Sequence, residues 1–333
     1  MKFGVFDHID ANGMPLREQY KQRLRLVEMY ERLGFYCYHL AEHHATTLGV
    51  ASSSSVFLSA VAQRTRTLKF GPLVYVLPLH HPIRLLEEIG MLDQLSGGRF
   101  QLGVGQGGQP AEHARFGIAQ GDIKPMFDEM LEILLKAMGS EVLDHRGRFY
   151  TLPRVPQVVK PIQRPHPPLW YGTGSPERAA WAVEHGVNLV SMMPNGRTRA
   201  ISDALKQAWA ATGRDEAERP FVGLSRILVV ADTDEEALRI VKRVWAAFAV
   251  NFNWLVNWLG EPPFPFPNEF EGAREMGLAF AGSPQSVRAW VEQAEEEAGV
   301  DYMALELVFG DMTDAEATRS IELFAKEVMP AFA

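Results

Sequence analysis

The chain has 333 residues, of which 47% are apolar and 22% are charged, and its formal net charge is −8. This composition is typical of a globular protein, and the negative charge argues against a general affinity for nucleic acid or for an anionic membrane surface. The single cysteine, Cys37, excludes an intramolecular disulfide and favours a reducing, cytoplasmic environment. We expect neither a secretory leader nor a membrane span, because the signal-peptide pattern and long apolar runs are both missing.

Apolar runs and amphipathic segments alternate along most of the chain. The expected strands are residues 2–6, 35–40, 68–77, 100–104, 169–171, 187–193, 221–231 and 302–308. The expected helices are residues 16–33, 52–64, 83–95, 127–138, 176–185, 197–211, 234–258, 284–298 and 314–328. Because about eight strands alternate with helices, the pattern predicts an α/β fold with a parallel sheet. The chain length favours a closed (β/α)8 TIM barrel with insertions, and a doubly wound open sheet is the alternative.

We expect a single domain over residues 1–333 with two excursions from the alternation. Residues 141–167 contain a predicted hairpin followed by a proline-rich run. Residues 260–282 begin with an irregular stretch rich in proline and phenylalanine. A long irregular loop usually has a function, so we interpret residues 262–267 as a lid.

Three side chains that handle protons, Glu42, His43 and His44, follow the predicted strand 35–40. In parallel α/β proteins, sites are built where strands end. Histidine accepts or donates a proton near neutral pH, and a glutamate can orient it. The alternative is a histidine that only packs at the barrel rim.

A second histidine pair, His80 and His81, follows the predicted strand 68–77, so a metal site has to be considered. Adjacent residues of an extended chain point in opposite directions, so each pair offers one ligand. The sequence contains no His-Glu-x-x-His motif and no paired cysteines. We therefore expect no metal.

Two glycine-rich loops follow predicted strands. Residues 103–108 contain a G-x-G-x-x-G spacing, but no helix is expected directly after it, so we interpret the match as coincidental. These glycines still indicate a tight turn or a close approach to the backbone. In residues 172–176, Ser175 suits an N-cap and Pro176 the first helical position, which predicts a phosphate site at a helix start. A capped helix without a ligand is the alternative.

Several short motifs occur together in a fixed order. They are residues 1–4, 41–44, 77–78 with 81–82, 92–100 and 172–177. As an ordered set they resemble the bacterial-luciferase-like family of flavin-dependent monooxygenases. The resemblance runs nearly from end to end and is strongest over residues 1–117.

The resemblance implies a barrel, usually dimeric, that receives reduced FMN from a separate flavin reductase and uses molecular oxygen to oxygenate a small apolar organic molecule. It implies that His43 is catalytic, assisted by Glu42 or His44, and that the peptide between Leu73 and Val74 is cis. The implied cofactor-binding residues are Leu73, Val74, Gln106, Tyr171, Gly172, Thr173, Gly174 and Ser175.

One departure from the family concerns phosphate binding. Relatives often carry arginine where Gln106 stands, and Lys124 is the candidate to replace it. Two alternative functions remain open, a deazaflavin-dependent oxidoreductase that transfers hydride and a non-catalytic flavin-binding protein.

Overall fold

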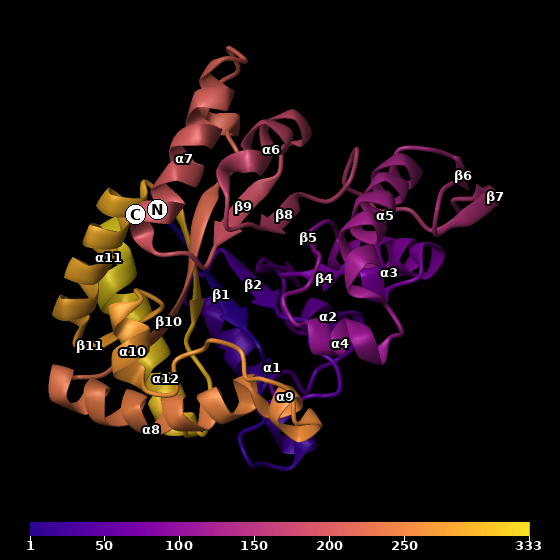
Figure 1. Cartoon of the computed structure of the whole chain (residues 1–333). Helices are drawn as coiled ribbons and strands as arrows, with labels where there is room; N and C mark the ends of the chain where they lie inside the picture. Colours follow the sequence, from indigo (N-terminus) through magenta and orange to yellow (C-terminus); the bar gives the residue numbers. More distant parts are fainter. Residues whose placement is uncertain (333) are drawn as a thin grey trace.

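Parallel strands form the wall of a barrel in this computed structural model, which describes residues 1–332 (Figure 1). The main sheet has ten strands in the order β3-β2-β1-β12-β10-β9-β8-β5-β4, with β11 beside β10. Its strands are β1 (Lys2–Asp7), β2 (Cys37–Leu40), β3 (Lys69–Pro72), β4 (Tyr75–Val76), β5 (Leu102–Gly105), β8 (Leu169–Gly172), β9 (Asn188–Ser191), β10 (Val222–Val230), β11 (Ala279–Gly282) and β12 (Tyr302–Glu306).

The barrel closes through the pair β3 and β4, which are two halves of one segment. β3 pairs with β2, whereas β4 pairs with β5, and the bridge between Phe70 and Phe100 joins the two sides. With β3 and β4 counted as one stave, β1, β2, β3/β4, β5, β8, β9, β10 and β12 make eight. The predicted (β/α)8 TIM barrel with insertions is therefore confirmed, and the doubly wound alternative is wrong.

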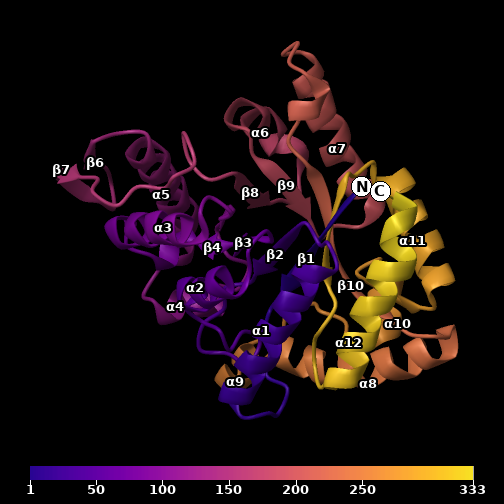
Figure 2. The same ribbon diagram turned by 180° about the vertical axis from the view of Figure 1, so that it is seen from behind.

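Helices surround this wall on the outside, as Figures 1 and 2 show from opposite sides. They are α1 (Leu16–Arg32), α2 (Ser54–Arg64), α3 (Pro82–Ser96), α4 (Pro110–Arg115), α5 (Ile123–Met138), α6 (Ala179–His185), α7 (Asn195–Ala210), α8 (Asp234–Phe252), α9 (Trp254–Leu259), α10 (Phe270–Glu275), α11 (Pro284–Ala298) and α12 (Asp314–Leu323). The helices α2, α3, α4 and α5 gather on one side of the molecule, and α8 runs along its edge.

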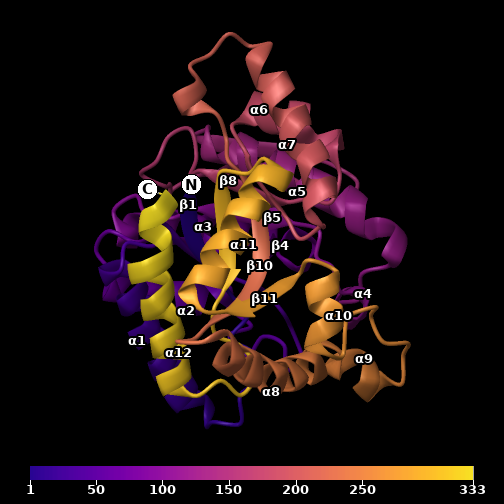
Figure 3. The same cartoon turned by 90° about the vertical axis from the view of Figure 1, so that its left-hand side faces the viewer.

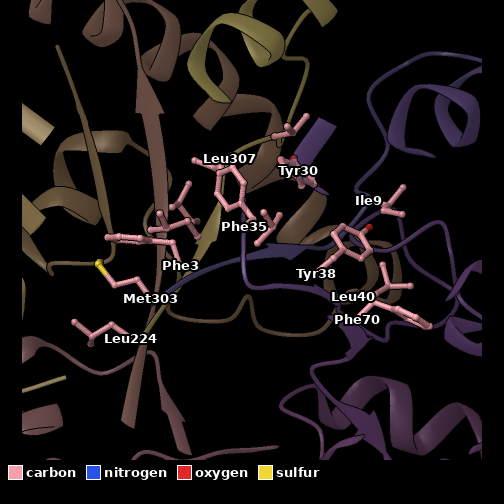
Figure 4. Close-up of a cluster of buried hydrophobic side chains, with 14 of the residues drawn as sticks. Phe3, Ile9, Tyr30, Phe35, Tyr38, Leu40, Phe70, Leu224, Met303 and Leu307 are labelled. Atoms are coloured by element: carbon pink, nitrogen blue, oxygen red, sulfur yellow. The ribbon is translucent and has the colours of Figure 1, made fainter. Parts of the chain in front are cut away.

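Side chains of each strand alternate between two apolar layers, as the period of a strand requires. Outward-facing residues such as Tyr38 and Met303 belong to the large core beneath the helices, part of which Figure 4 shows. Inward-facing residues fill the barrel itself, among them Phe6, Trp170 and Tyr302. The barrel interior is therefore a packed core.

Four expectations about elements need correction. The expected strand 68–77 is divided between Pro72 and Tyr75, where the peptide from Leu73 to Val74 is cis, as the resemblance implied. The expected helix 234–258 breaks at Asn253 into α8 and α9. The loop after β5 contains α4, and the excursion 260–282 contains α10 and β11. The sequence of β11, Ala-Phe-Ala-Gly, has few strand-forming residues, which explains why it was missed.

The excursion 141–167 contains the predicted hairpin, formed by β6 (Val142–Arg146) and β7 (Thr151–Pro156). The chain ends lie side by side, and the amino group of Met1 donates to the carbonyl oxygen of Phe332 at 2.9 Å (Figure 3). Over residues 1–332, every helix is too short or too polar to cross a membrane.

Candidate active site

His43 lies just beyond the end of β2 and is bound by a residue from α4. Its Nδ1 is 2.8 Å from Oε1 of Glu112, and Oε2 of the same carboxylate accepts the backbone N–H of His44 at 3.2 Å. Glu112 is buried, and the His43 side chain keeps 16% of its surface exposed. Glu112 thus holds the histidine loop through two separate hydrogen bonds.

Glu42 does not contact His43, contrary to the expectation that it orients this ring. Its carboxylate instead bonds to Nε2 of His44 at 2.7 Å, to Nε2 of His80 at 2.8 Å and to the backbone N–H of Val76 at 2.8 Å. Burial alone would raise the pKa of Glu42, but these hydrogen bonds outweigh it and lower the pKa to about 2. Burial acts against ionisation of His44, but the bond to Glu42 prevails and raises its pKa. The hydrogen bonds of Glu42 to His44 and to Val76 therefore tie the loop after β2 to β4.

The ring of His43 rests on a second histidine, His8, which directly follows β1. The centroids of the His8 and His43 rings are 5.4 Å apart with an interplanar angle of 18°. Nδ1 of His8 is 2.8 Å from Oε1 of Glu306 at the end of β12. Burial lowers the pKa of His8 to about 4 and raises that of Glu306 well above its usual range. These directions favour an uncharged pair in which the carboxyl proton is shared with Nδ1.

The cis peptide between Leu73 and Val74 lies in the stave next to β2, where the N–H of Leu73 donates to the carbonyl oxygen of Leu40 at 2.8 Å. The glycines of β5 allow the stave made of β3 and β4 to pack closely against β5. A Cβ atom on Gly105 would lie 2.5 Å from Val74, and one on Gly103 would lie 2.0 Å from the carbonyl oxygen of Pro72. The close approach that these glycines indicated is therefore that of the neighbouring stave.

The predicted phosphate loop follows β8 at the same end of the barrel. Ser175 caps the following helical turn, where its Oγ accepts the N–H of Glu177 at 3.2 Å. Open space surrounds Gly172, since a Cβ atom there would meet nothing within 4 Å. Thr173 stabilises the loop by donating its hydroxyl to the carbonyl oxygen of Ser175 at 3.0 Å.

Two basic side chains converge next to this loop. Arg178 donates to Asp128 at 3.2 Å, and Lys124 pairs with the same carboxylate. The guanidinium of Arg178 lies 5.8 Å from the ring centroid of Tyr171. The loop therefore combines small residues, a helix start and positive charge, which fits the phosphate of a mononucleotide.

The carbonyl oxygen of Gln106 faces His113, whose Nε2 lies 2.7 Å away.

An aromatic cluster from α8 and the excursion 260–282 packs toward His8. The rings of Phe248 and His8 are 5.6 Å apart, and Phe252 stacks on Phe266 at 3.8 Å. Phe248 of α8 is buried, whereas Phe264 keeps 37% of its surface exposed. The lid role of residues 262–267 stays a prediction.

Two cavities open on the surface. One of about 350 Å³ lies behind Glu42, between the amino ends of α2 and α3, and is lined by His80, Arg84 and Glu88 among others. A larger groove of about 550 Å³ lies over the excursion 141–167, and its lining contains none of the predicted site residues. Within residues 1–332, no group of three or more acidic, histidine or cysteine side chains is arranged to hold a metal ion.

The structure thus places Glu42, His43 and His44 after β2 on one side of the barrel end. The predicted phosphate loop follows β8 on another side of the same end. Sequence reasoning missed Glu112, His8, Glu306 and Arg178. Pro110 at a first helical position followed by an acidic residue is a helix-start signal that could have revealed α4. The contact of Glu112 with His43 spans 69 positions of the chain and has no local signal.

Comparison with known proteins agrees with this geometry. A family model described as luciferase-like monooxygenase matches residues 1–302. The uncharacterized protein y4wF of Sinorhizobium fredii is 41% identical over 94% of this chain and 92% of that protein. Limonene 1,2-monooxygenase of Rhodococcus erythropolis is 27% identical over 93% of this chain and 81% of that enzyme.

Solved structures share the fold over nearly the whole chain. Monooxygenase RslO1 from Streptomyces bottropensis has a TM-score of 0.89 at 24% identity, with both chains fully covered. The oxygenating constituent of 3,6-diketocamphane monooxygenase from Pseudomonas putida, solved with FMN, has a TM-score of 0.77 at 22% identity, covering 100% and 99%. The coenzyme F420 dependent tetrahydromethanopterin reductase from Methanopyrus kandleri has a TM-score of 0.74 at 18% identity, also covering 100% and 99%. At these identities the likeness concerns the fold alone.

Proposed function

The chain belongs to the luciferase-like monooxygenase family, and we propose that it uses reduced FMN and molecular oxygen to oxygenate a small apolar organic substrate. The observation that carries this proposal is His43, an acid–base side chain held by Glu112 at the barrel end, beside the stave with the cis peptide. Bound reduced FMN would supply two electrons, so that one oxygen atom enters the substrate and the other leaves as water.

Each part of the site has a defined task in this proposal. Ser175 and its neighbouring loop, with Arg178, would bind the phosphate, and the backbone of Leu73 and Val74 would face the flavin ring. His43 would hold a proton and give it to oxygen during turnover. The aromatic cluster around Phe252 would exclude water.

The cofactor choice rests on the phosphate loop and on the family. The F420-dependent reductase with the same fold keeps hydride transfer as the alternative, and a flavin-binding protein without catalysis is the other. We propose that a separate reductase supplies the reduced flavin. Trigonelline monooxygenase of Acinetobacter baylyi, which is described as an oxygenase component, supports this. It is 26% identical over 71% of this chain and 67% of that enzyme. A cytoplasmic location, favoured by the lone buried Cys37, fits this supply.

We also propose a homodimer that forms through α2 and α3. Their outer face exposes Val56, Met91 and Leu95, with 70%, 53% and 49% of each residue accessible. Exposed apolar side chains that gather on one face mark a protein contact. Arg84 and Glu88 of α3 pair with each other at 3.1 Å, which leaves the apolar side chains of these helices as the surface that a second copy would cover.

The test combines anaerobic titration with oxygen consumption. Fluorescence titration should give tighter binding of reduced FMN than of oxidised FMN or reduced F420. After mixing with oxygen and limonene, a linear alkanal or trigonelline as probes, product should carry one atom of ¹⁸O from ¹⁸O₂. Tight binding of reduced F420 without binding of reduced FMN would replace the monooxygenase by hydride transfer. Binding of both FMN redox states without oxygen uptake would indicate a flavin-binding protein.

A further inference from the structure

We propose that Glu112 is a positioning residue that keeps His43 in the tautomer protonated on Nδ1, so that Nε2 is the nitrogen that exchanges protons at the barrel mouth. The tautomer itself follows from contacts within the protein. Its consequence for turnover rests on the proposed function.

The first step is the pattern of donors around the Glu112 carboxylate. Oε2 faces the backbone N–H of His44 at 3.2 Å, and a backbone N–H can only donate. Oε1 faces Nδ1 of His43 at 2.8 Å. Glu112 stands in the first turn of α4, so its carboxylate lies beside a backbone N–H and a ring nitrogen. An ionised carboxylate only accepts, so Nδ1 must carry the proton.

The second step is the fixed plane of the ring. His8 stacks against His43 at 5.4 Å, and burial keeps His8 neutral by lowering its pKa to about 4. Gly49 also approaches the ring closely, since a Cβ atom there would lie 2.9 Å from Cβ and 3.6 Å from Cδ2 of His43. The ring therefore has little freedom to flip and exchange its two nitrogens.

The third step concerns the other nitrogen. Among residues 1–332, no hydrogen-bond partner is found for Nε2 of His43, whereas Nδ1 is engaged by Glu112. The titratable groups nearby have other partners, since Glu42 is bound to His44 and His80, and Glu306 is bound to His8. Nε2 is thus the position at which the neutral ring can take up a proton from water and then, as the imidazolium, pass it to an oxygen atom in the mouth.

In this pair the carboxylate fixes the tautomer of the imidazole, as it does in other enzymes with a catalytic histidine. An amide in place of the carboxylate should reverse the tautomer. In Glu112→Gln, the side-chain oxygen must accept the N–H of His44, because that backbone group cannot turn. The NH₂ group then points at Nδ1, which has to become an acceptor. The neutral ring should therefore switch to the tautomer protonated on Nε2.

Nitrogen-15 NMR of the histidine-labelled protein without flavin measures this directly. The His43 signals are assigned by their loss in His43→Ala, and spectra are taken at a pH where the ring is neutral. Wild type and Glu112→Asp should show a protonated Nδ1 and a bare Nε2, and Glu112→Gln should show the reverse. A wild-type ring protonated on Nε2, or an unchanged tautomer in Glu112→Gln, would overturn the proposal.

Turnover provides the second readout. Glu112→Gln should bind reduced FMN as wild type does but lower the product-to-peroxide ratio by about 10- to 100-fold, the scale of a misplaced acid–base group, and Glu112→Asp should recover part of it. If wild type forms no product with any probe, the proposed function fails while the tautomer result stands. If product forms equally well in Glu112→Gln despite an inverted tautomer, the role of Glu112 in turnover is refuted.

Discussion

His43 shows how a single side chain is fixed by residues that lie far apart in the chain. Glu112 from α4 engages its Nδ1, His8 just after β1 lies against its ring, and Gly49 packs against its Cβ. These contacts come from the segment after β1, from the segment after β5, and from the loop after β2 that carries His43 itself. The acid–base site is therefore a product of barrel closure.

Replacing His43 by alanine should uncouple oxygen reduction from substrate oxygenation. The variant should still fold and bind FMN, although Glu112 loses a partner at a cost of about 1–3 kcal/mol. Product per oxygen consumed should fall by about 100-fold, with hydrogen peroxide released instead. His185→Ala, which removes a half-exposed histidine of α6, is the control. Equal product-to-peroxide ratios in all three proteins would make His43 a rim histidine.

The buried carboxyl group of Asp10 should make the free energy of unfolding depend on pH. Its Oδ2 accepts N–H groups from Asn251 at 2.8 Å and Gly310 at 3.0 Å. Burial raises its pKa from 3.8 to about 8. Because the folded state binds this proton more tightly than the unfolded state, Asp10 lowers stability as pH rises from about 4 to about 8.

Asp10→Asn keeps an oxygen for both donors and cannot ionise, so it should remove this dependence. Its free energy of unfolding, measured in urea, should fall less steeply with pH than that of wild type, by up to about 1.4 kcal/mol per unit. Asp203→Asn, at an exposed position of α7, should follow the wild-type slope. Parallel curves for wild type and Asp10→Asn between pH 5 and 8 would contradict the raised pKa.

The residues that could be predicted from the sequence are those with a local signal. His43 and its neighbours stand at a strand end, and Ser175 precedes a proline at a helix start. The pairing of Glu42 could not be predicted, because its carboxylate turns to Val76 in the next stave. Glu112 was missed for the same reason, since only the folded barrel brings α4 to the loop after β2.

At the scale of elements, α4 is too short to hold Glu112 by itself. It has six residues and is fixed by contact with α9, where Ala111 packs on Leu255 and Val256. Arg115 and Glu261 add an ion pair at 3.6 Å. Figure 3 shows α4 and α9 side by side at one edge of the molecule. The segment that begins the excursion 260–282 therefore supports the helix that orients His43.

Leu255→Ala should loosen α4 while leaving the barrel folded. The lost side chain is buried at the edge of the molecule, so we expect local opening of α4 and α9 and a reduced product-to-peroxide ratio. Hydrogen exchange read by mass spectrometry should show faster exchange in residues 110–116 and unchanged exchange in β1 and β12. Trp258→Ala, which removes a side chain that is 71% exposed on the same helix, is the control. Unchanged exchange in α4 would show that α9 does not support it.

A variant next to the proposed phosphate loop should affect binding of the phosphate of FMN without affecting binding of the flavin ring. Arg178 lies beside Tyr171 and is the last residue of the turn that Ser175 caps. Arg178→Ala should weaken FMN binding by about tenfold, the effect of one charge-assisted contact of about 1.4 kcal/mol, but leave riboflavin binding unchanged. Arg199→Ala, on the outside of α7, should change neither. Equal losses for FMN and riboflavin would place Arg178 away from the phosphate.

Most elements could be predicted from hydrophobic period, and the exceptions have physical causes. The strand 68–77 is divided where one half pairs with β2 and the other with β5, which no local pattern records. β11 consists of alanine, phenylalanine and glycine and depends on its pairing with β10. α10 and α4 have six residues each, too few for a clear period.

At the scale of the whole molecule, one side of the barrel combines α2, α3 and the cavity behind Glu42. The cavity is lined by Arg84 and Glu88 of α3, and the exposed Val56 and Met91 lie on the same two helices. A second copy placed there would cover apolar surface and close the cavity next to the Glu42–His44 pair. Dimer formation and the electrostatics of the site would then be coupled.

The double variant Val56→Glu with Met91→Glu should therefore dissociate the dimer. Four carboxylates would face one another across a two-fold axis, where like charges repel and apolar contact is lost. Sedimentation velocity should give a dimer for wild type and a monomer for the variant. The matched control is Val250→Glu with Met276→Glu, which changes apolar side chains of α8 and the excursion that are 62% and 47% exposed. The control should stay dimeric. A wild-type monomer, or a control that dissociates equally, would show that α2 and α3 do not form the contact.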